Sequence, residues 1–291
     1  MRHLLCCIAL VSIFTQSTLA QPKPPADVVF ERDVVYGKTG EVELKLNLAR
    51  PVKHDEKSAP LPVVVVIHGG GWAAGSREGH NDLIWKFAQR GYVAVTISYR
   101  FAPKFPFPAQ VEDAKCAVRY LRAHAKKLNI NPQKIGAVGF SAGAHLSMML
   151  GSMDAGDGLE GDGGHGEEAS KVQAVVSFVG PTDFTADDLP AATDNIIKNW
   201  LGGDTKEKAE AAKKASPITY VNKGDAPMLL LQGTVDPLIP NTQAYRMAEA
   251  MTKAGVKGRV ELILGGGHGW GGKDMEHSAQ QMNEFFDRWL K

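Results

Sequence analysis

The sequence predicts an α/β fold: a mostly parallel sheet with an antiparallel N-terminal hairpin and helices on both faces. Two observations carry this prediction. Unbroken apolar runs rich in β-branched residues recur along the chain, which is typical of strands covered on both faces. Amphipathic segments of helical length separate these runs, and strands that alternate with helices form parallel sheets. We therefore expect residues 28–291 to form one α/β domain.

The opening hairpin is predicted by a different pattern. Residues 28–36 and 41–48 are expected to be strands joined by a turn around Gly40, and in the second of them apolar and polar residues alternate. Alternation of this kind indicates a half-buried strand. The later strands are expected at residues 63–67, 93–97, 135–138, 172–179, 228–231 and 260–264. The helices are expected at residues 81–90, 108–128, 142–153, 242–254 and 276–290.

The first twenty residues have the order and length of a secretory signal. Arg2 supplies a positive charge, residues 4–14 are apolar, and small residues end the segment at Ala20. The apolar stretch is too short to span a bilayer. We expect cleavage near Ala20, a proline-rich linker over residues 21–27, and a secreted or periplasmic protein without a membrane span.

Charge and cysteine content exclude several classes of partner and structure. The formal net charge is +1 over 291 residues, so nucleic-acid binding is disfavoured. Two of the three cysteines lie in the expected signal, which leaves Cys116 without an internal disulfide partner. Cys116 falls in an amphipathic helical pattern, and we expect it to be a buried apolar residue.

Two stretches interrupt the alternation of strands and helices. Residues 154–170 are glycine-rich and acidic, but the twelfth position of a calcium loop counted from Asp154 is His165 where glutamate is required. We expect a mobile, solvated loop there. Residues 184–219 are predicted to form either an inserted cap or a long connecting helix. Since the remaining histidines show no metal-ligand spacing, neither a metal nor a cofactor is expected.

Glycine-rich turns follow two of the expected strands. His68-Gly69-Gly70-Gly71-Trp72 follows one, and three glycines there free the backbone amides to face an anion. Ser141 follows another, in the pattern G-x-S-x-G, which exposes a serine hydroxyl at a strand-to-helix turn. The amide of Ala142 then lies at a helix N-terminus. The amides of Gly69, Gly70 and Ala142 are therefore expected to form an oxyanion hole.

A carboxylate and an imidazole follow the last two expected strands. Asp236 and His268 each lie just past an apolar run, and the chain order Ser141, Asp236, His268 is that of the α/β-hydrolase triad. A serine hydroxyl needs a base at neutral pH, and an aspartate orients that base. Asp183 also follows a strand and is the alternative acid. His68 and His145 are interpreted as structural.

These motifs make the chain similar to a known group. Over residues 28–290 it resembles α/β-hydrolase esterases with an HGGG or HGGxW oxyanion motif, which include hormone-sensitive-lipase-like carboxylesterases and esterases related to acetylxylan and feruloyl esterases. The resemblance rests on the two glycine motifs above together with Ser98–Pro103, Phe107–Asp113 and Gly233–Asp236. It implies that Arg100 and Asp113 brace the site. Phe140 before the serine and Ala144 after Gly143 favour the acetylxylan and feruloyl group.

The resemblance and the export signal together predict a secreted serine esterase for short acyl esters, with deacetylation of carbohydrate as the expected reaction. Feruloyl or general carboxylesterase activity is the alternative. A peptidase or amidase, and a non-catalytic binding protein on the same scaffold, are the rivals from other classes. Trp72 and Trp270 flank the expected site and are predicted to contact the small-molecule or carbohydrate ester. The sequence does not indicate an oligomeric state.

Overall fold

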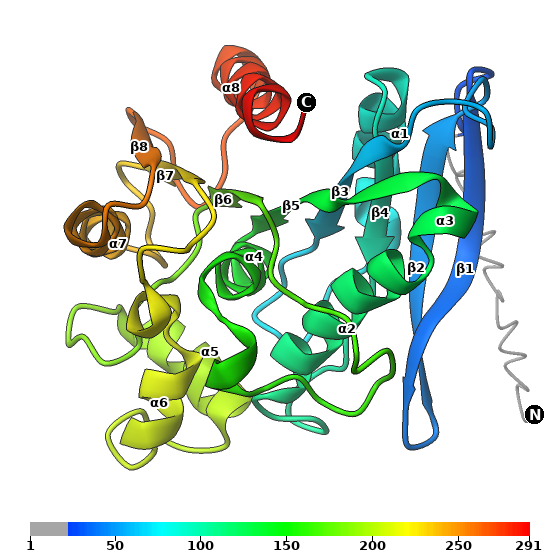
Figure 1. Ribbon diagram of the computed structural model, residues 1–291. Helices are drawn as coiled ribbons and strands as arrows, with labels where there is room; N and C mark the ends of the chain where they lie inside the picture. The colour runs from blue at the N-terminus through cyan, green and yellow to red at the C-terminus, as the bar shows by residue number, and fades with distance from the viewer. Residues whose placement is uncertain (1–22) are drawn as a thin grey trace, which may run out of the picture.

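An eight-stranded sheet runs through the protein in a computed structural model that describes residues 23–291 (Figure 1). Its strand order is β1-β2-β4-β3-β5-β6-β7-β8. The pairs β1–β2 and β2–β4 are antiparallel, and all later pairs are parallel. The predicted fold class is thereby confirmed. The predicted signal over residues 1–20 lies outside the described residues.

The elements follow the predicted order. The strands are β1 (Val28–Thr39), β2 (Val42–Pro51), β3 (Leu61–Ile67), β4 (Val93–Ile97), β5 (Ile130–Phe140), β6 (Ala174–Phe178), β7 (Met228–Gly233) and β8 (Gly258–Ile263). The helices are α1 (Asn81–Gln89), α2 (Ala109–Ala123), α3 (Ala125–Leu128), α4 (Ala142–Ser152), α5 (Ala191–Leu201), α6 (Ala209–Ala215), α7 (Asn241–Ala254) and α8 (Gly272–Leu290).

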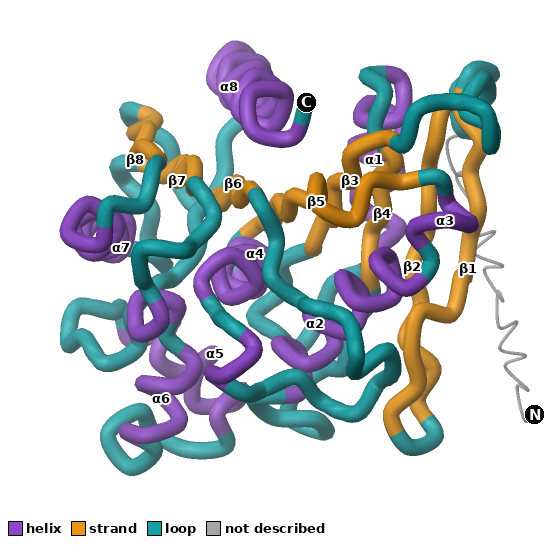
Figure 2. The backbone as a smooth tube through the Cα atoms, viewed as in Figure 1, coloured by secondary structure: helices purple, strands orange, loops and turns teal. Residues whose placement is uncertain are grey.

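Helices cover both faces of the sheet, as Figure 2 shows. Helices α1 and α8 pack on one face, while α2, α4 and α7 pack on the other with α5 and α6 beyond them. Strand β3 shows why the apolar runs are unbroken: Val63 and Val65 belong to one core, and Val64 and Val66 to the opposite core. In a strand with a core on each side, successive side chains are all buried, so every position favours an apolar residue.

The strand order reverses between β3 and β5, and this reversal places the glycine-rich turns side by side. The chain passes from β3 outward to β4, then returns to β5 on the other side of β3. Ile67 at the end of β3 pairs with Gly139 near the end of β5. Ligands of open parallel sheets bind outside the carboxyl ends of strands at such a switch point. A ligand site is therefore expected at residues 68–72 and 139–143.

Some predicted boundaries differ from the observed ones. The helix expected over residues 108–128 is divided at His124, whose Nδ1 bonds the carbonyl oxygen of Tyr120 at 2.9 Å and so ends α2. Strand β5 begins five residues early, at Ile130, which pairs with Leu61. Residues 184–219 contain two helices, α5 and α6, in place of a single connecting helix.

The loop at residues 154–170 is largely exposed, as expected, but it is anchored by long-range contacts where a mobile loop was expected. Glu160 in this loop accepts from Lys115 at 2.7 Å and from Arg119 at 2.8 Å, and both basic side chains of α2 are 1% exposed. The backbone of Gly163 also accepts from the amide of Lys38 at 3.1 Å. Long-range ion pairs, which local composition does not reveal, hold the loop against α2 and β1. Cys116 beside it is free and buried, as predicted.

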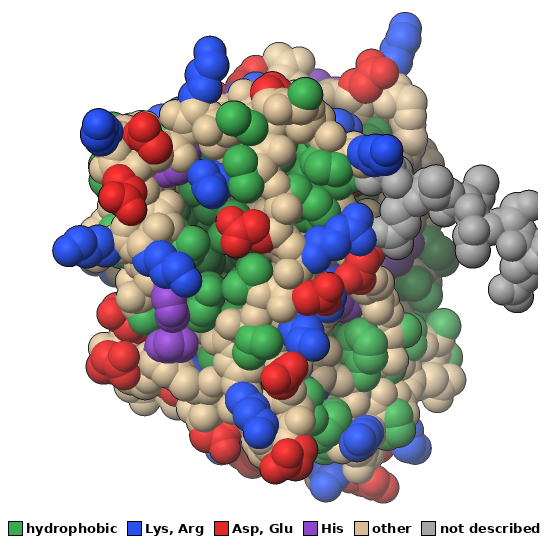
Figure 3. Space-filling model, turned by 90° about the vertical axis from the view of Figure 1, so that its right-hand side faces the viewer, with side chains coloured by type: hydrophobic (Ala, Val, Ile, Leu, Met, Phe, Trp, Pro, Cys, Tyr) green, Lys and Arg blue, Asp and Glu red, His purple; other side chains and the backbone are tan. Residues whose placement is uncertain are grey.

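The surface shows no dominant charge on the face that Figure 3 presents, where basic and acidic side chains are interspersed. This agrees with the near-zero net charge of the sequence. Within residues 23–291, none of the helices has both the length and the apolar character needed to cross a membrane.

Replacing Glu160 with glutamine should destabilise the protein strongly. Lys115 and Arg119 would remain buried without their counterion, and breaking a buried pair in this way costs about 3 kcal/mol or more. Urea unfolding of Glu160→Gln measures the loss. The control is Glu249→Gln, whose partner Lys253 is exposed, with an expected change of less than about 0.5 kcal/mol. Equal losses in the two variants would contradict the anchoring role of Glu160.

Candidate active site

Ser141 occupies a sharp turn between β5 and α4. Its backbone has φ 54° and ψ −117°, a conformation that non-glycine residues rarely adopt. The flanking glycines make the turn possible: a Cβ on Gly139 would clash with the carbonyl of Gly143, and a Cβ on Gly143 would clash with the carbonyl oxygen of Ile67. The pattern G-x-S-x-G thus reflects close backbone approach at both glycines.

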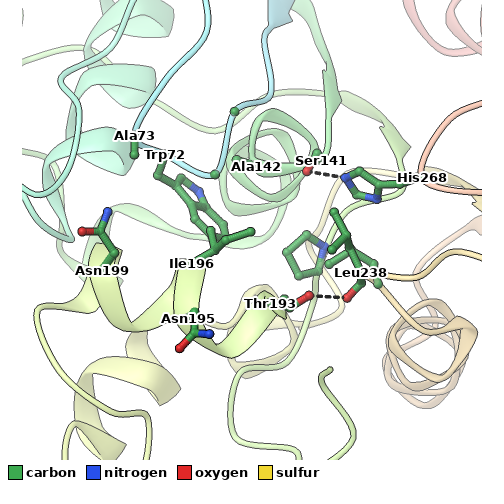
Figure 4. A pocket seen from close by; sticks show the side chains of 14 residues that line it. Trp72, Ala73, Ser141, Ala142, Thr193, Asn195, Ile196, Asn199, Leu238 and His268 are labelled. Carbon is green, nitrogen blue, oxygen red and sulfur yellow. Dashed lines mark hydrogen bonds between the residues drawn. The ribbon is translucent and has the colours of Figure 1, made fainter. Parts of the chain in front are cut away.

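The side chains of Ser141, His268 and Asp236 form a continuous chain of hydrogen bonds. His268 lies in the loop after β8, and its Nε2 is 2.8 Å from Ser141 Oγ (Figure 4). Its Nδ1 is 2.9 Å and 3.1 Å from the two carboxylate oxygens of Asp236, which follows β7. With the proton on Nδ1, the imidazole donates to Asp236 and accepts from the serine hydroxyl. Three segments more than 30 residues apart thereby meet at one edge of the sheet.

Asp236 is held in its charged form. Burial alone would raise the pKa of this carboxyl, but hydrogen bonds from His268 and from the amides of Ile239 and Leu238 outweigh burial and leave the pKa below its usual value. A charged carboxylate at this position fixes the tautomer of His268 and stabilises its cation.

The carboxylate of Asp183, the alternative acid, has other partners than His268. One of its carboxylate oxygens accepts from the amide and the hydroxyl of Thr185, at 3.0 Å and 2.6 Å. The other lies 3.3 Å from Nε of Arg246. Because its carboxylate pairs with Thr185 and Arg246, the geometry favours Asp236 as the partner of His268.

The turn after β3 lies directly against the elbow. A Cβ on Gly69 would approach the carbonyl oxygen of Phe140 to 2.8 Å and Cβ of Ser141 to 3.3 Å. Gly70 has φ 116° and lines the same pocket as Ser141 and Ala142. Ala142 begins α4, so its amide has no carbonyl one turn earlier in the helix to bond. Gly71, the third glycine of this turn, also lines the pocket.

Trp72 clamps this turn in place. Its indole is 3% exposed and stacks on Trp200 of α5, with ring centroids 3.9 Å apart. Its Nε1 donates to Nδ1 of His145, one helical turn past Ser141, at 3.2 Å. His145 in turn donates from Nε2 to the carbonyl of Ala215 at 2.7 Å. Trp72 therefore joins the glycine turn to both α4 and the 184–219 segment.

His68 braces the same turn. Its Nδ1 bonds the carbonyl oxygen of Gly69 at 2.7 Å, and its ring stacks on Tyr99 with centroids 4.4 Å apart. The hydroxyl of Tyr99 donates to the carbonyl of His68 at 3.0 Å. These contacts agree with the structural role expected for His68.

A pocket of about 580 Å³ opens beside Ser141 and His268, and most of its wall is apolar. Helix α5 forms one side and the segment after Asp236 another. Sequence reasoning missed these walls, because only the tertiary fold brings them to the serine. The lining residues outside the turns and the triad are Pro181, Thr193, Asn195, Ile196, Asn199, Leu238 and Ile239.

Trp72 and Trp270 differ in position. Trp72 lines the pocket, and its contact with substrate stays a prediction. Trp270 lies outside the lining: its Nε1 donates to Ser278 of α8 at 3.0 Å, and its ring packs 6.0 Å from that of Phe178. The prediction of substrate contact for Trp270 is therefore corrected, because α8 draws the indole toward the opposite core.

Comparisons with known proteins agree with this geometry. Esterase LipC of Mycobacterium tuberculosis is 30% identical over 250 residues, which cover 83% of this chain and 60% of LipC. A truncated carbohydrate esterase from gut microbiota superposes with a TM-score of 0.80 at 28% identity, covering 91% of this chain and 98% of that one. Propionate-bound Est2 of Thermogutta terrifontis superposes with a TM-score of 0.75 at 29% identity. The match covers 89% of this chain and 93% of Est2.

The fold is that of the α/β-hydrolases, and the similar proteins named above are esterases. The family is also shown: the BD-FAE family model matches residues 48–251, so the chain belongs to the BD-FAE family. The chain spans about half to three fifths of the length of three curated relatives that it matches, the mycobacterial proteins LipC, LipM and LipQ.

The buried His145 should make the stability of the protein sensitive to acid. Burial lowers its pKa to about 4 from an ordinary value of 6.5. Between these values the unfolded chain binds a proton that the folded chain does not, so stability falls as the pH falls from 6.5 to 4, by about 3 kcal/mol in all.

His145→Gln removes this proton while its amide can still accept from Trp72 and donate to Ala215. The difference in the free energy of unfolding between the wild type and His145→Gln should therefore shrink in urea titrations as the pH is lowered from 7 to 4. Parallel pH curves for the two proteins would show that His145 is not the group responsible.

Proposed function

We propose that this protein is a secreted serine esterase that hydrolyses short-chain carboxylic esters through an acyl-enzyme, and that acetyl groups on carbohydrate are its substrates. One observation carries the proposal: Ser141, His268 and Asp236 are joined by hydrogen bonds at the end of a largely apolar pocket. Export is supported by the signal-like sequence of residues 1–20.

In the proposed reaction Ser141 Oγ attacks the ester carbonyl while His268 Nε2 takes the hydroxyl proton. His268 then gives this proton to the departing alkoxide, and the acyl group stays on Ser141. A water molecule activated by His268 attacks the acyl-enzyme and releases the acid. Asp236 keeps His268 in the required tautomer throughout.

The negative charge that develops on the carbonyl oxygen must be stabilised by hydrogen-bond donors. The amides of Gly69, Gly70 and Ala142 are proposed for this role, and Ala142 adds the positive end of α4. The clamp on Trp72 supports the proposal, because it holds the turn at residues 69–72 against the elbow before the substrate arrives. Removing one such donor typically costs about 3 kcal/mol of transition-state stabilisation.

Two similar structures support short acyl groups and carbohydrate as the parts of the proposed substrate. One similar structure is a carbohydrate esterase of nearly the same extent as this chain. Another was solved with propionate, a three-carbon acid. A pocket of about 580 Å³ has room for such an acyl group together with part of the alcohol. Feruloyl or general carboxylesterase activity is the second candidate, because the apolar walls beside Ile196 and Leu238 suit an aromatic acyl group as well.

Ser141→Ala should abolish ester hydrolysis, with a loss near 10⁶-fold since the nucleophile is removed. Acetate release from acetylated xylan and from 4-nitrophenyl acetate measures the loss, and circular dichroism checks that the variant is folded. Cleavage of both esters by the wild type supports a carbohydrate deacetylase. Cleavage of the small ester alone supports the second candidate. Activity retained by Ser141→Ala would refute the nucleophile.

Asp236→Asn should lower kcat about 10⁴-fold, because a neutral amide leaves His268 free to adopt the wrong tautomer. Asp183→Asn is the matched control and should change kcat only a few-fold, since Asp183 contacts Thr185 and Arg246. Steady-state rates on 4-nitrophenyl acetate compare the two variants. The reverse order of effects would identify Asp183 as the catalytic acid.

A further inference from the structure

Two carboxamide side chains stand at the rim of the pocket without partners. Asn195 and Asn199 are four residues apart on α5, so they lie on one face of the helix. Both are exposed, and both line the pocket. Within residues 23–291, neither side chain makes a hydrogen bond or an ion pair, so the two amides are free to bind a ligand.

The rest of the pocket offers few free polar groups. Thr193 on the same helix already donates its hydroxyl to the carbonyl of Leu238 at 2.6 Å. Ile196, between the two asparagines in sequence, packs toward Gly71 at the oxyanion turn. Figure 4 shows Asn195 and Asn199 across the pocket from Ser141 and His268. A ligand that reaches from the serine to the rim therefore meets an apolar wall first and carboxamides second.

Helix α5 is anchored by its buried side, so the backbone positions of its two asparagines are fixed. Ile197 and Trp200 on the opposite side of the helix are fully buried. Trp200 stacks on Trp72 and donates from Nε1 to Gln110 at 2.7 Å. Groups presented on a rigid element lose little conformational entropy when they bind a ligand.

We propose that Asn195 and Asn199 determine specificity by binding hydroxyl groups on the alcohol part of the ester. The inference rests on the proposed function and assigns the recognition of its carbohydrate alcohol to two residues of α5. A carboxamide both donates and accepts hydrogen bonds, as a sugar hydroxyl does. An alkyl alcohol would leave both amides without a partner, and a site built to bind hydroxyl groups discriminates against a ligand that lacks them.

The test uses two esters with the same acyl group, methyl β-xyloside monoacetate and butyl acetate, with acetate release as the common readout. In Asn195→Ala/Asn199→Ala, kcat/KM for the sugar ester should fall about 10-fold or more, mainly through KM. For butyl acetate the change should stay below about 2-fold. Each single variant should show an intermediate loss on the sugar ester.

Lys198→Ala is the matched control, because Lys198 is exposed on the same helix but does not line the pocket. It should leave both esters unaffected. Equal losses on the two esters in the double variant, or no loss on the sugar ester, would overturn the assignment of Asn195 and Asn199. If the wild type releases acetate from neither ester, or Ser141→Ala from both, the proposed function itself fails and the assignment with it.

Discussion

The close approach of α4 to the end of β3 is the constraint on which the site depends. Gly143 lies so near the carbonyl oxygen of Ile67 that no side chain fits between them, and Gly139 lies equally near Gly143. This approach forces Ser141 into its rare backbone conformation and brings the elbow against Gly69. The unfavourable energy of this strained backbone is offset by the packing of the central strands, which have a core on each side.

Trp72 extends this rigidity beyond the sheet. One indole contacts α4 through His145 and α5 through Trp200, so the elbow, the glycine turn and the pocket wall share one buried aromatic cluster. Such packing holds catalytic groups within the narrow tolerances that their reaction requires. The neutral state of His145 belongs to the same arrangement, because only a neutral ring can accept from Trp72 while it donates to Ala215.

The sequence predicted those parts of the site that follow directly from strand ends. Ser141, Asp236 and His268 each come just after an apolar run, and parallel strands bring their carboxyl ends to one edge. Features that depend on distant partners were not predictable. Glu160 pairs with Lys115 and Arg119, over 40 residues away, and Trp270 packs on Phe178 of β6. Nothing local marks Asn195 or Asn199 as lining the pocket. No local sequence pattern predicts these contacts, because they depend on tertiary packing.

The origin of the pocket wall has a consequence for the two sides of α5. Ser141 and His268 come from turns at the sheet edge, whereas one wall of the pocket comes from α5, in the stretch between β6 and β7. The side chains of Asn195 and Asn199 on the exposed side of α5 are free of contacts with Trp200 and the elbow, so substitutions there alter the pocket rim and leave the buried packing in place. The exposed and the buried sides of α5 are thus under different constraints, because the exposed side lines the pocket and the buried side holds Trp72 in place.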